Sequence, residues 1–256
     1  MILVWHNGRF LEDGAPVFAL SDRIRLGDGV YDSLLMAQGR PLHLARHRKR
    51  LEEGCAILEI ALDLSNWENI LLEFAERNGM GKGRYAVNTV ISRGPSPRGL
   101  KMPLDVQIQM GIRASPVPDA YPPVHAMIAE TVRRNEGSPL ARVKSLQCAD
   151  SILALRLAEK KGMNEAILLN NAGAVACASA ANIFALVEGR LVTPPLKDGA
   201  MAGIVRGLMM EHYAVAERTL WPQDLLRAEA LFLTNSIRGV TAITSLNGKS
   251  FGEPPL

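Results

Sequence analysis

The chain contains few cysteines, and their spacing excludes two kinds of cross-link. Three occur among 256 residues, Cys55, Cys148 and Cys177, and no two of them form a CxxC pair. Neither a disulfide framework nor a structural zinc site is therefore indicated, and we expect no metal ion. A reducing compartment is the default interpretation of this cysteine usage.

Long apolar runs are also missing. No segment has the length and continuity of a membrane span. Residues 1–8 lack both the basic start and the apolar length of a signal peptide. We therefore expect a cytoplasmic protein with no membrane partner.

A strong excess of charge of either sign is absent as well. The formal net charge is +3, and the basic residues are spread among acidic ones except in the run 46–50. A solvated helix face or an anion site inside the fold explains that run as well as nucleic acid does, so we expect no nucleic-acid partner. Hydrophobic residues make up 48% and charged residues 21%, which excludes a wholly disordered chain.

The first part of the chain mixes strand signals with helix signals. Asn-Gly between short extended runs is a strong hairpin signal. Ser65 and Glu68 have the spacing of a capping box, which predicts the start of a helix. The predicted elements are a hairpin turning at Asn7-Gly8, helices over 42–58 and from Ser65 to Gly79, and strands over 84–92 and 105–111.

Residues 115–123 contain four prolines, which favour an extended and stiff segment. We therefore expect a small α+β domain over 1–114, a linker over 115–123, and a larger domain over 124–256 that carries Lys144. The elements predicted in the larger domain are strands over 124–131, 166–169, 231–234 and 240–246, helices over 150–161 and from Gly203, and a hairpin turning at Glu188-Gly189.

Lys144 lies in the stretch Lys144-Ser-Leu-Gln147, just before the helix predicted over 150–161. A lysine amine that a low-dielectric pocket holds partly neutral can attack an aldehyde and can later move protons. Most lysines are ordinary surface residues, so Lys144 is a catalytic candidate only in combination with the other motifs.

Two further motifs suit a phosphate group. Arg50 stands in His47-Arg-Lys-Arg50-Leu51, and a guanidinium matches phosphate with paired hydrogen bonds. The glycine-containing turn 199–206 is expected to open a helix at Gly203 and Ile204, where unpaired backbone amides bind anions. A solvated helix face and a plain loop are the alternatives for these two motifs.

Together, and in their order along the chain, these motifs resemble the class IV aminotransferase family, the fold-type IV enzymes that use pyridoxal 5'-phosphate (PLP). The motif Gly27-Asp28-Gly29-Val-Tyr31 and the stretch 173–184 add to the resemblance, which runs from the opening hairpin to Val240. It implies a two-domain α+β or α/β fold of the D-amino-acid-aminotransferase type, with a small α+β lobe, a larger barrel-like lobe and PLP between them. It also implies a small-molecule carboxylate substrate and a homodimer with its active site at the subunit interface.

The resemblance assigns roles to particular residues. Lys144 would be catalytic and bonded to the cofactor. In relatives, an aromatic residue at Tyr31 lines the substrate pocket, although a core tyrosine is an equal alternative. The cofactor contacts implied are Arg50, Lys144, Cys177, Asn182, Gly203, Ile204, Thr234 and Asn235, and the substrate contacts implied are Tyr31, Arg98 and Ser236.

Two departures bear on the reaction. D-amino-acid transaminases have an Arg-x-His element where this chain has Arg98 followed by Leu100, which weakens the D-amino-acid interpretation. The loop 232–240 resembles the Thr-Asn-Ser-x-x-Gly loop common among aminodeoxychorismate lyases more closely than the corresponding loop of branched-chain and D-amino-acid transaminases. Hydroxyl and amide groups on such a loop can donate to substrate carboxylates, although Thr-Asn-Ser also makes an ordinary turn.

Cys177 is the main departure. Most relatives have a glutamate there, which pairs with the pyridine nitrogen of the cofactor, and a neutral thiol is a poor substitute. Three hypotheses follow, of which we prefer a 4-amino-4-deoxychorismate lyase that releases 4-aminobenzoate and pyruvate for folate synthesis. The others are a branched-chain, D-amino-acid or amine transaminase and a catalytically silent PLP-binding relative.

Overall fold

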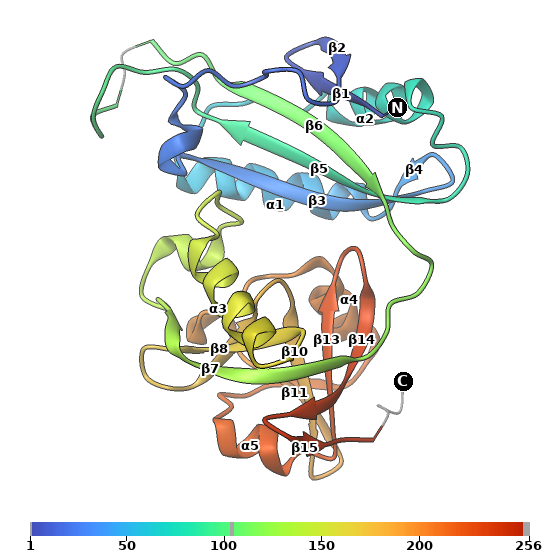
Figure 1. Ribbon diagram of the computed structural model, residues 1–256, viewed down its shortest axis with the longest axis vertical. Coiled ribbons are helices and arrows are strands. Elements are labelled where there is room, and N and C mark those ends of the chain that lie inside the picture. The colour runs from blue at the N-terminus through green and yellow to red at the C-terminus, as the bar shows by residue number, and fades with distance from the viewer. Residues whose placement is uncertain (1, 103–104, 253–256) are drawn as a thin grey trace. The chain divides into compact units, whose positions relative to one another are not determined.

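The computed structural model describes residues 2–102 and 105–252, which form two compact units. Unit 1 comprises Met1–Asp119 and Val143–Gln147, and unit 2 comprises Ala120–Arg142 and Cys148–Leu256 (Figure 1). The segment with Lys144 therefore belongs to unit 1. A division of the chain at the proline-rich linker alone would place it in the larger domain instead. The reason for its place in unit 1 is backbone pairing: Tyr31 N donates to Lys144 O at 2.9 Å, and Leu146 N donates to Gly29 O at 3.1 Å.

Unit 1 is built on a six-stranded antiparallel sheet in the order β2-β1-β6-β5-β3-β4. Its strands are β1 Leu3–His6, β2 Arg9–Glu12, β3 Gly29–Ala37, β4 Arg40–Pro41, β5 Arg84–Ser92 and β6 Gln109–Pro116, and its helices are η1 Arg23–Leu26, α1 Leu44–Ile57 and α2 Trp67–Arg77. Apolar side chains of both α-helices share one core with the sheet, including Leu51 of α1 and Trp67 and Phe74 of α2. Burial of that face fixes the helices on the sheet.

Most of the elements predicted for unit 1 are confirmed, with two corrections. Asn7 and Gly8 turn the β1–β2 hairpin with φ of 44° and 84°, the left-handed region that this turn requires. The predicted capping box is wrong: Asn66 is the residue before α2, and the Ser65 hydroxyl donates to Asp63 Oδ2 instead. Strand β6 begins at Gln109 and runs through Pro116 into the expected linker, because a proline at a strand end removes only one donor from the ladder.

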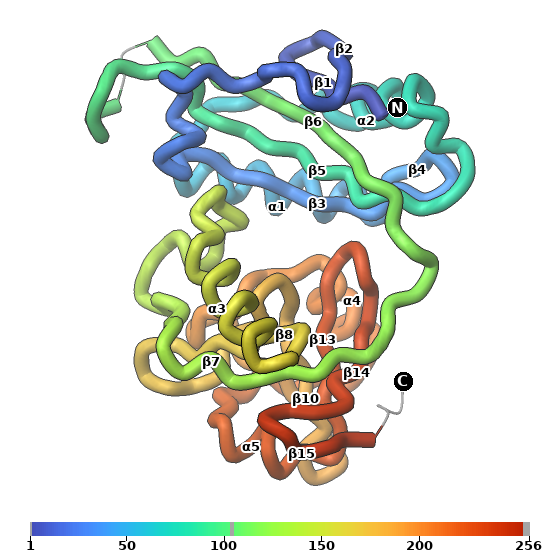
Figure 2. The backbone as a smooth tube through the Cα atoms, viewed as in Figure 1, coloured from blue at the N-terminus to red at the C-terminus, as the bar shows by residue number. Residues whose placement is uncertain are grey.

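Unit 2 contains a nine-stranded mixed sheet, in which β12-β11-β10-β13-β14-β7-β8-β9 form the path and β15 pairs with β14. The elements are β7 Val124–Arg134, η2 Pro139–Arg142, α3 Ala149–Lys160, β8 Glu165–Asn170, β9 Val175–Ala178, β10 Asn182–Val187, β11 Arg190–Thr193, η3 Leu196–Asp198, α4 Ile204–His212, β12 Val215–Glu217, α5 Pro222–Arg227, β13 Ala230–Asn235, β14 Gly239–Leu246 and β15 Lys249–Ser250. The hairpin of β13 and β14 is the orange-to-red pair in Figure 2.

The sheet of unit 2 curls, because strands far apart in its order share one core. Ile167 of β8, Ile183 of β10 and Val192 of β11 belong to this inner core, which α5 closes with Leu225. We call the side of the sheet that faces this core the inner face. The outer face is covered by α3 over β7 and β8, and by α4 over β10 and β13. Among the described residues, none belongs to a helix long and apolar enough to cross a membrane.

Candidate functional site

Lys144 is held by its backbone against the start of β3. Besides the two backbone hydrogen bonds already described, Ser145 forms an isolated bridge with Val30. The Lys144 Nζ lies 3.9 Å from the centroid of the Tyr31 ring, and both side chains are half-buried. An ammonium over an aromatic face is attracted by the ring, so Tyr31 restrains the amine. Unit 1 therefore brings the predicted catalytic lysine and the predicted substrate-contacting tyrosine together.

The glycines before Tyr31 make this approach possible. A Cβ on Gly29 would lie 2.2 Å from Ile91 O and 2.7 Å from Leu146 Cδ1, so no larger residue fits. Gly27 ends η1 with φ +68°, and a Cβ there would lie 2.7 Å from Gln147 Cγ. The Gly-Asp-Gly motif therefore lets the lysine segment pack closely on β3.

Arg50 is positioned by a buried carboxylate. Its Nε donates to Asp32 Oδ2 at 2.9 Å and its Nη2 donates to Asp32 Oδ1 at 3.0 Å. The Nδ1 of His47 lies 2.6 Å from Asp32 Oδ1. Burial opposes ionisation of Asp32, but the hydrogen bond with His47 and the charge of Arg50 outweigh it and lower the pKa of this carboxyl. The guanidinium keeps Nη1 unpaired among the described residues and can offer it to an anion.

Arg98 is exposed on the loop between β5 and β6. The loop is tethered by Arg23, whose Nη2 donates to Leu100 O at 3.2 Å and whose Nη1 donates to Lys101 O at 3.3 Å. Arg23 is itself buried and paired with Asp28. The loop therefore presents Arg98 to solvent from an anchored base, where a guanidinium can meet a carboxylate.

In unit 2, three of the predicted cofactor residues meet on the outer face of the sheet. Asn182 and Thr234 are direct partners across β10 and β13. The Asn182 Nδ2 donates to Met201 O at 2.8 Å, and a Cβ on Gly203 would lie only 2.0 Å from Asn182 Oδ1. Asn182 thus connects Thr234 with the turn that opens α4.

This corner has unsatisfied polar groups that fit a phosphate. Gly203 precedes α4 without a side-chain cap, so the first-turn amides, beginning with Ile204, are donors that the helix itself cannot pair. The Thr234 hydroxyl is buried and has no hydrogen-bond partner among the described residues. A helix N-terminus with a nearby hydroxyl is a ready anion site. The chain therefore fits the phosphate of PLP here, whereas buried Arg206 is bound to Pro194 O and Glu217.

The close contact at Gly203 leads to a prediction. Gly203→Ala is expected to lower the free energy of unfolding by about 1–3 kcal/mol, because the added methyl must displace Asn182 or the start of α4. Affinity for PLP should fall at the same time. Urea unfolding and equilibrium dialysis of PLP measure the two effects. Gly81→Ala is the control, since no atom lies within 4 Å of a Cβ there; equal effects in both variants would contradict this assignment.

Cys177 lies in β9 on the outer face, where it packs with Leu168, Ala154 and other small apolar residues against α3. Burial raises the pKa of the Cys177 thiol; the charge of Arg134 opposes this shift and that of Glu165 adds to it. The side chain is therefore a neutral thiol at neutral pH.

Asn235 and Ser236 form the turn between β13 and β14. The Asn235 Oδ1 accepts hydrogen bonds from Ile237 N at 3.0 Å and Arg238 N at 2.8 Å. Gly239 completes the turn with φ +67°. Asn235 thus has a structural role, which the ordinary-turn interpretation anticipates, and Ser236 is half-buried beside it.

The sequence motifs missed the groups that orient Arg50. The arginine motif contains His47 without indicating its role, and no motif includes Asp32. A usable signal existed, since His47 and Arg50 stand three positions apart and so share a helix face, and an aspartate inside an apolar strand needs a partner.

Comparison with known proteins finds relatives that match nearly the whole chain. A family model described as amino-transferase class IV matches residues 29–246. A Methanocaldococcus jannaschii protein provisionally named a branched-chain-amino-acid aminotransferase is 28% identical over 257 residues, which cover 96% of this chain and 88% of that protein. The aminodeoxychorismate lyase of Bacillus subtilis is 26% identical over 260 residues, covering 98% of this chain and 90% of the lyase.

Solved structures share the fold. The branched-chain aminotransferase of Thermoproteus uzoniensis has a TM-score of 0.92 at 22% identity, with 99% of this chain and 90% of that chain covered. At this identity the likeness concerns the fold alone. The fold-type IV architecture expected from the sequence is confirmed.

Proposed function

Since the chain belongs to the class IV aminotransferase family, whose members depend on PLP, we propose that it is a 4-amino-4-deoxychorismate lyase. The substrate would be split into 4-aminobenzoate and pyruvate for folate synthesis. When bound, PLP accepts electron density as a bond at the amino-bearing carbon breaks. We propose that Lys144 bonds to PLP, that Arg50, Gly203, Ile204 and Thr234 hold its phosphate, and that Cys177, Asn182 and Asn235 border it.

The observation that carries the proposal is the burial of Cys177 beside α3, which raises the pKa of its thiol and favours the neutral form. A carboxylate at this position would keep the pyridine nitrogen protonated and strengthen the ring as an electron acceptor, whereas a thiol is a weak hydrogen-bonding group. Loss of pyruvate from aminodeoxychorismate makes the remaining ring aromatic. A reaction with this gain of resonance energy depends less on the electron acceptor, so it tolerates Cys177 better than transamination does.

We assign the proton transfer of this reaction to Lys144. In the proposed step its Nζ removes the proton from the amino-bearing ring carbon, while the adjacent carbon–oxygen bond breaks and the ring becomes aromatic. The departing enolpyruvate takes a proton on its methylene carbon and becomes pyruvate, so atoms and charge balance. Tyr31 restrains the amine, and Arg98 and Ser236 would hold the two substrate carboxylates.

Two further observations support the lyase, and one supports a transaminase. The turn Thr234-Asn235-Ser236 resembles that of aminodeoxychorismate lyases, and the lyase of Bacillus subtilis matches the chain over 98% of its length. The similarity to a protein named as a branched-chain aminotransferase favours amino transfer as the second candidate. A silent PLP-binding protein is the third.

Parallel assays on the purified holoenzyme separate these candidates. Aminodeoxychorismate is supplied alone, and amino donors are supplied with a keto acid, while 4-aminobenzoate and the new amino acid are measured by chromatography. The lyase is expected to release 4-aminobenzoate and pyruvate in equal amounts without amino transfer. Amino transfer alone would overturn the proposal in favour of a transaminase, and cofactor absorbance with neither product would identify a silent relative.

We also propose a homodimer in the cytoplasm. Ile152 and Leu153 on α3 are 57% and 51% exposed, and adjacent apolar residues on a helix surface suit a subunit contact. Among the described residues no cysteine forms a disulfide, as is usual in a reducing compartment.

A further inference from the structure

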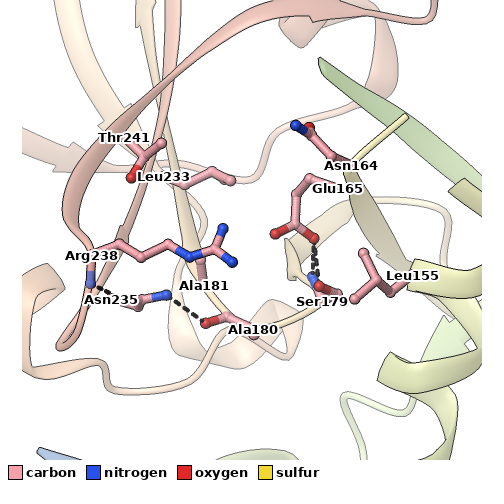
Figure 3. A pocket seen from close by; sticks show the side chains of 10 residues that line it. All are labelled: Leu155, Asn164, Glu165, Ser179, Ala180, Ala181, Leu233, Asn235, Arg238 and Thr241. Carbon is pink, nitrogen blue, oxygen red and sulfur yellow. Dashed lines mark hydrogen bonds between the residues drawn. The ribbon is translucent and has the colours of Figure 1, made fainter. Parts of the chain in front are cut away.

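A pocket opens within unit 2 at the end of the curled sheet where β8 and β10 begin and β13 ends. The space between its lining side chains, counted together with the open solvent at its mouth, is about 450 Å³. Leu155 and Leu233 supply apolar walls, and Glu165, Arg238 and Thr241 supply polar groups (Figure 3). The mouth of a barrel-like sheet with a few convergent polar groups is a common place for a ligand.

The pocket lies on the opposite face of the sheet from Asn182 and Thr234 of the phosphate corner, although Asn235, proposed above to border PLP, is among the residues that line it. Leu233 and Thr241 are direct partners across β13 and β14, and both line the pocket. Thr234 is the next residue of β13, and successive strand side chains point to opposite faces. Thr234 faces outward with Asn182, whereas Leu233 and Thr241 reach the pocket from the inner face and Leu155 of α3 closes it at the rim of the sheet. The pocket is therefore separate from the phosphate corner.

Glu165 supplies a buried carboxylate that lacks a cationic partner. The side chain is 4% exposed, and its Oε1 accepts hydrogen bonds from Ala166 N at 2.8 Å, Ser179 N at 3.1 Å and the Ser179 hydroxyl. Among the described residues, none donates to Oε2 and none forms an ion pair with this carboxylate. Buried glutamates are rarely left unpaired, because removing an ion from water is costly. Oε2 is therefore an acceptor suited to an ammonium group.

Arg238 and Thr241 supply the complementary groups. The Arg238 side chain points toward Glu165 across the pocket, yet the two form no ion pair (Figure 3). Its guanidinium carbon lies 5.3 Å from the centroid of the Tyr121 ring, an attraction that restrains the side chain. The Thr241 hydroxyl is buried without a hydrogen-bond partner among the described residues. A carboxylate could accept hydrogen bonds from both groups.

We propose that this pocket binds a small amino carboxylate, with the amine on Glu165 and the carboxylate on Arg238 and Thr241. Such a ligand would pair with both the Glu165 carboxylate and the Arg238 guanidinium, which form no ion pair with each other. Leu155 and Leu233 would contact its carbon skeleton. The site is distinct from the phosphate corner of Asn182, Gly203 and Thr234, with Asn235 shared between the pocket and the residues proposed to border PLP. The inference does not depend on which reaction the enzyme catalyses.

Isothermal titration calorimetry of the holoenzyme tests this proposal with proline, piperidine-3-carboxylate and piperidine-4-carboxylate. These secondary amines present both charges at increasing separations, and the visible absorbance checks that the cofactor is unchanged. At least one is expected to bind about tenfold or more tightly than piperidine or cyclohexanecarboxylate, which carry one charge each. Equal binding of all five compounds would overturn the proposal.

Three variants locate the binding. Arg238→Gln is expected to weaken it at least about tenfold, because a charged hydrogen bond to the carboxylate is lost. Arg190→Gln, an exposed arginine of β11 outside the pocket, should bind as the wild type does. Arg98→Gln should also bind normally; weakening there instead would place the ligand at the proposed substrate site and refute the second site. If the wild type binds no probe and Arg238→Gln mainly lowers the melting temperature, Arg238 is the partner of Glu165 itself and the proposal is wrong.

Discussion

Lys144→Ala is expected to lower kcat by roughly 10³-fold and to remove the visible absorbance of the protein-bound cofactor. The amine is the group that we propose to bond to PLP and to move the proton, and alanine can do neither. The backbone of residue 144 is held through its carbonyl oxygen and by the bridge at Ser145, which the substitution leaves in place. The loss should therefore be chemical, with little change in the thermal unfolding midpoint.

Absorbance spectra, steady-state rates and thermal unfolding of the same preparations check this prediction. Lys82→Ala is the matched control, because Lys82 is an exposed lysine of the same unit in the turn before β5. It should retain both the absorbance and the rate. Wild-type absorbance in Lys144→Ala would show that another residue holds the cofactor.

Asp32→Asn is expected to lower the free energy of unfolding by about 3–5 kcal/mol, the usual cost of removing one partner from a buried ion pair. Asp32 is 1% exposed and accepts two hydrogen bonds from Arg50, while His47 contacts the same carboxylate. The amide has nearly the same shape but no charge, so Arg50 would be left without its counterion. Because the same carboxylate orients the guanidinium, affinity for PLP should fall as well.

The pH dependence of stability provides a second measurement for Asp32. Its pKa in the folded protein is below its usual value, so it binds its proton more weakly when folded than when unfolded. Its contribution is fully present above the unfolded pKa of about 3.9 and is lost as the pH falls through the lower folded value. The wild type should lose stability on acidification more steeply than Asp32→Asn does.

Urea unfolding between pH 7 and pH 3 measures both effects, with Asp13→Asn as the control because Asp13 is an exposed aspartate of the same unit. We expect Asp13→Asn to match the wild type at every pH. If Asp32→Asn were as stable as Asp13→Asn at pH 7, the buried pair would not support Arg50 as described.

Local sequence patterns predicted those turns and helices whose positions depend on neighbouring residues. The turns at Asn7-Gly8 and Glu188-Gly189 are where expected: both positions of each turn take positive φ, which glycine adopts freely at the second position. The cap of α2 was mispredicted for a local reason too, since Asp63 competes successfully for the Ser65 hydroxyl. Helix α3 fits its prediction within a residue at each end.

Long-range pairing decided the groups that the sequence motifs missed. An aspartate inside an apolar strand indicates that it needs a partner, but only the tertiary structure shows that an arginine and a histidine of α1 converge on it, as they do at Asp32. The pocket of Glu165, Arg238 and Thr241 is another example. Its residues come from separated strands and a turn, and the register between β13 and β14 alone places Thr241 on the inner face.

The sequence by itself determined the family and the main candidates, because the lysine, arginine and glycine motifs occur in a characteristic order along the chain. It also identified Cys177 as the departure that separates hypotheses about the reaction. Only the tertiary structure decided how these residues are supported: Asp32 orienting Arg50, Asn182 linking Thr234 to Gly203, and the pleat of β13 separating the phosphate corner from a second pocket. The physical reason is that motifs specify side-chain chemistry, whereas burial and hydrogen-bond partners depend on strand register and packing between distant segments.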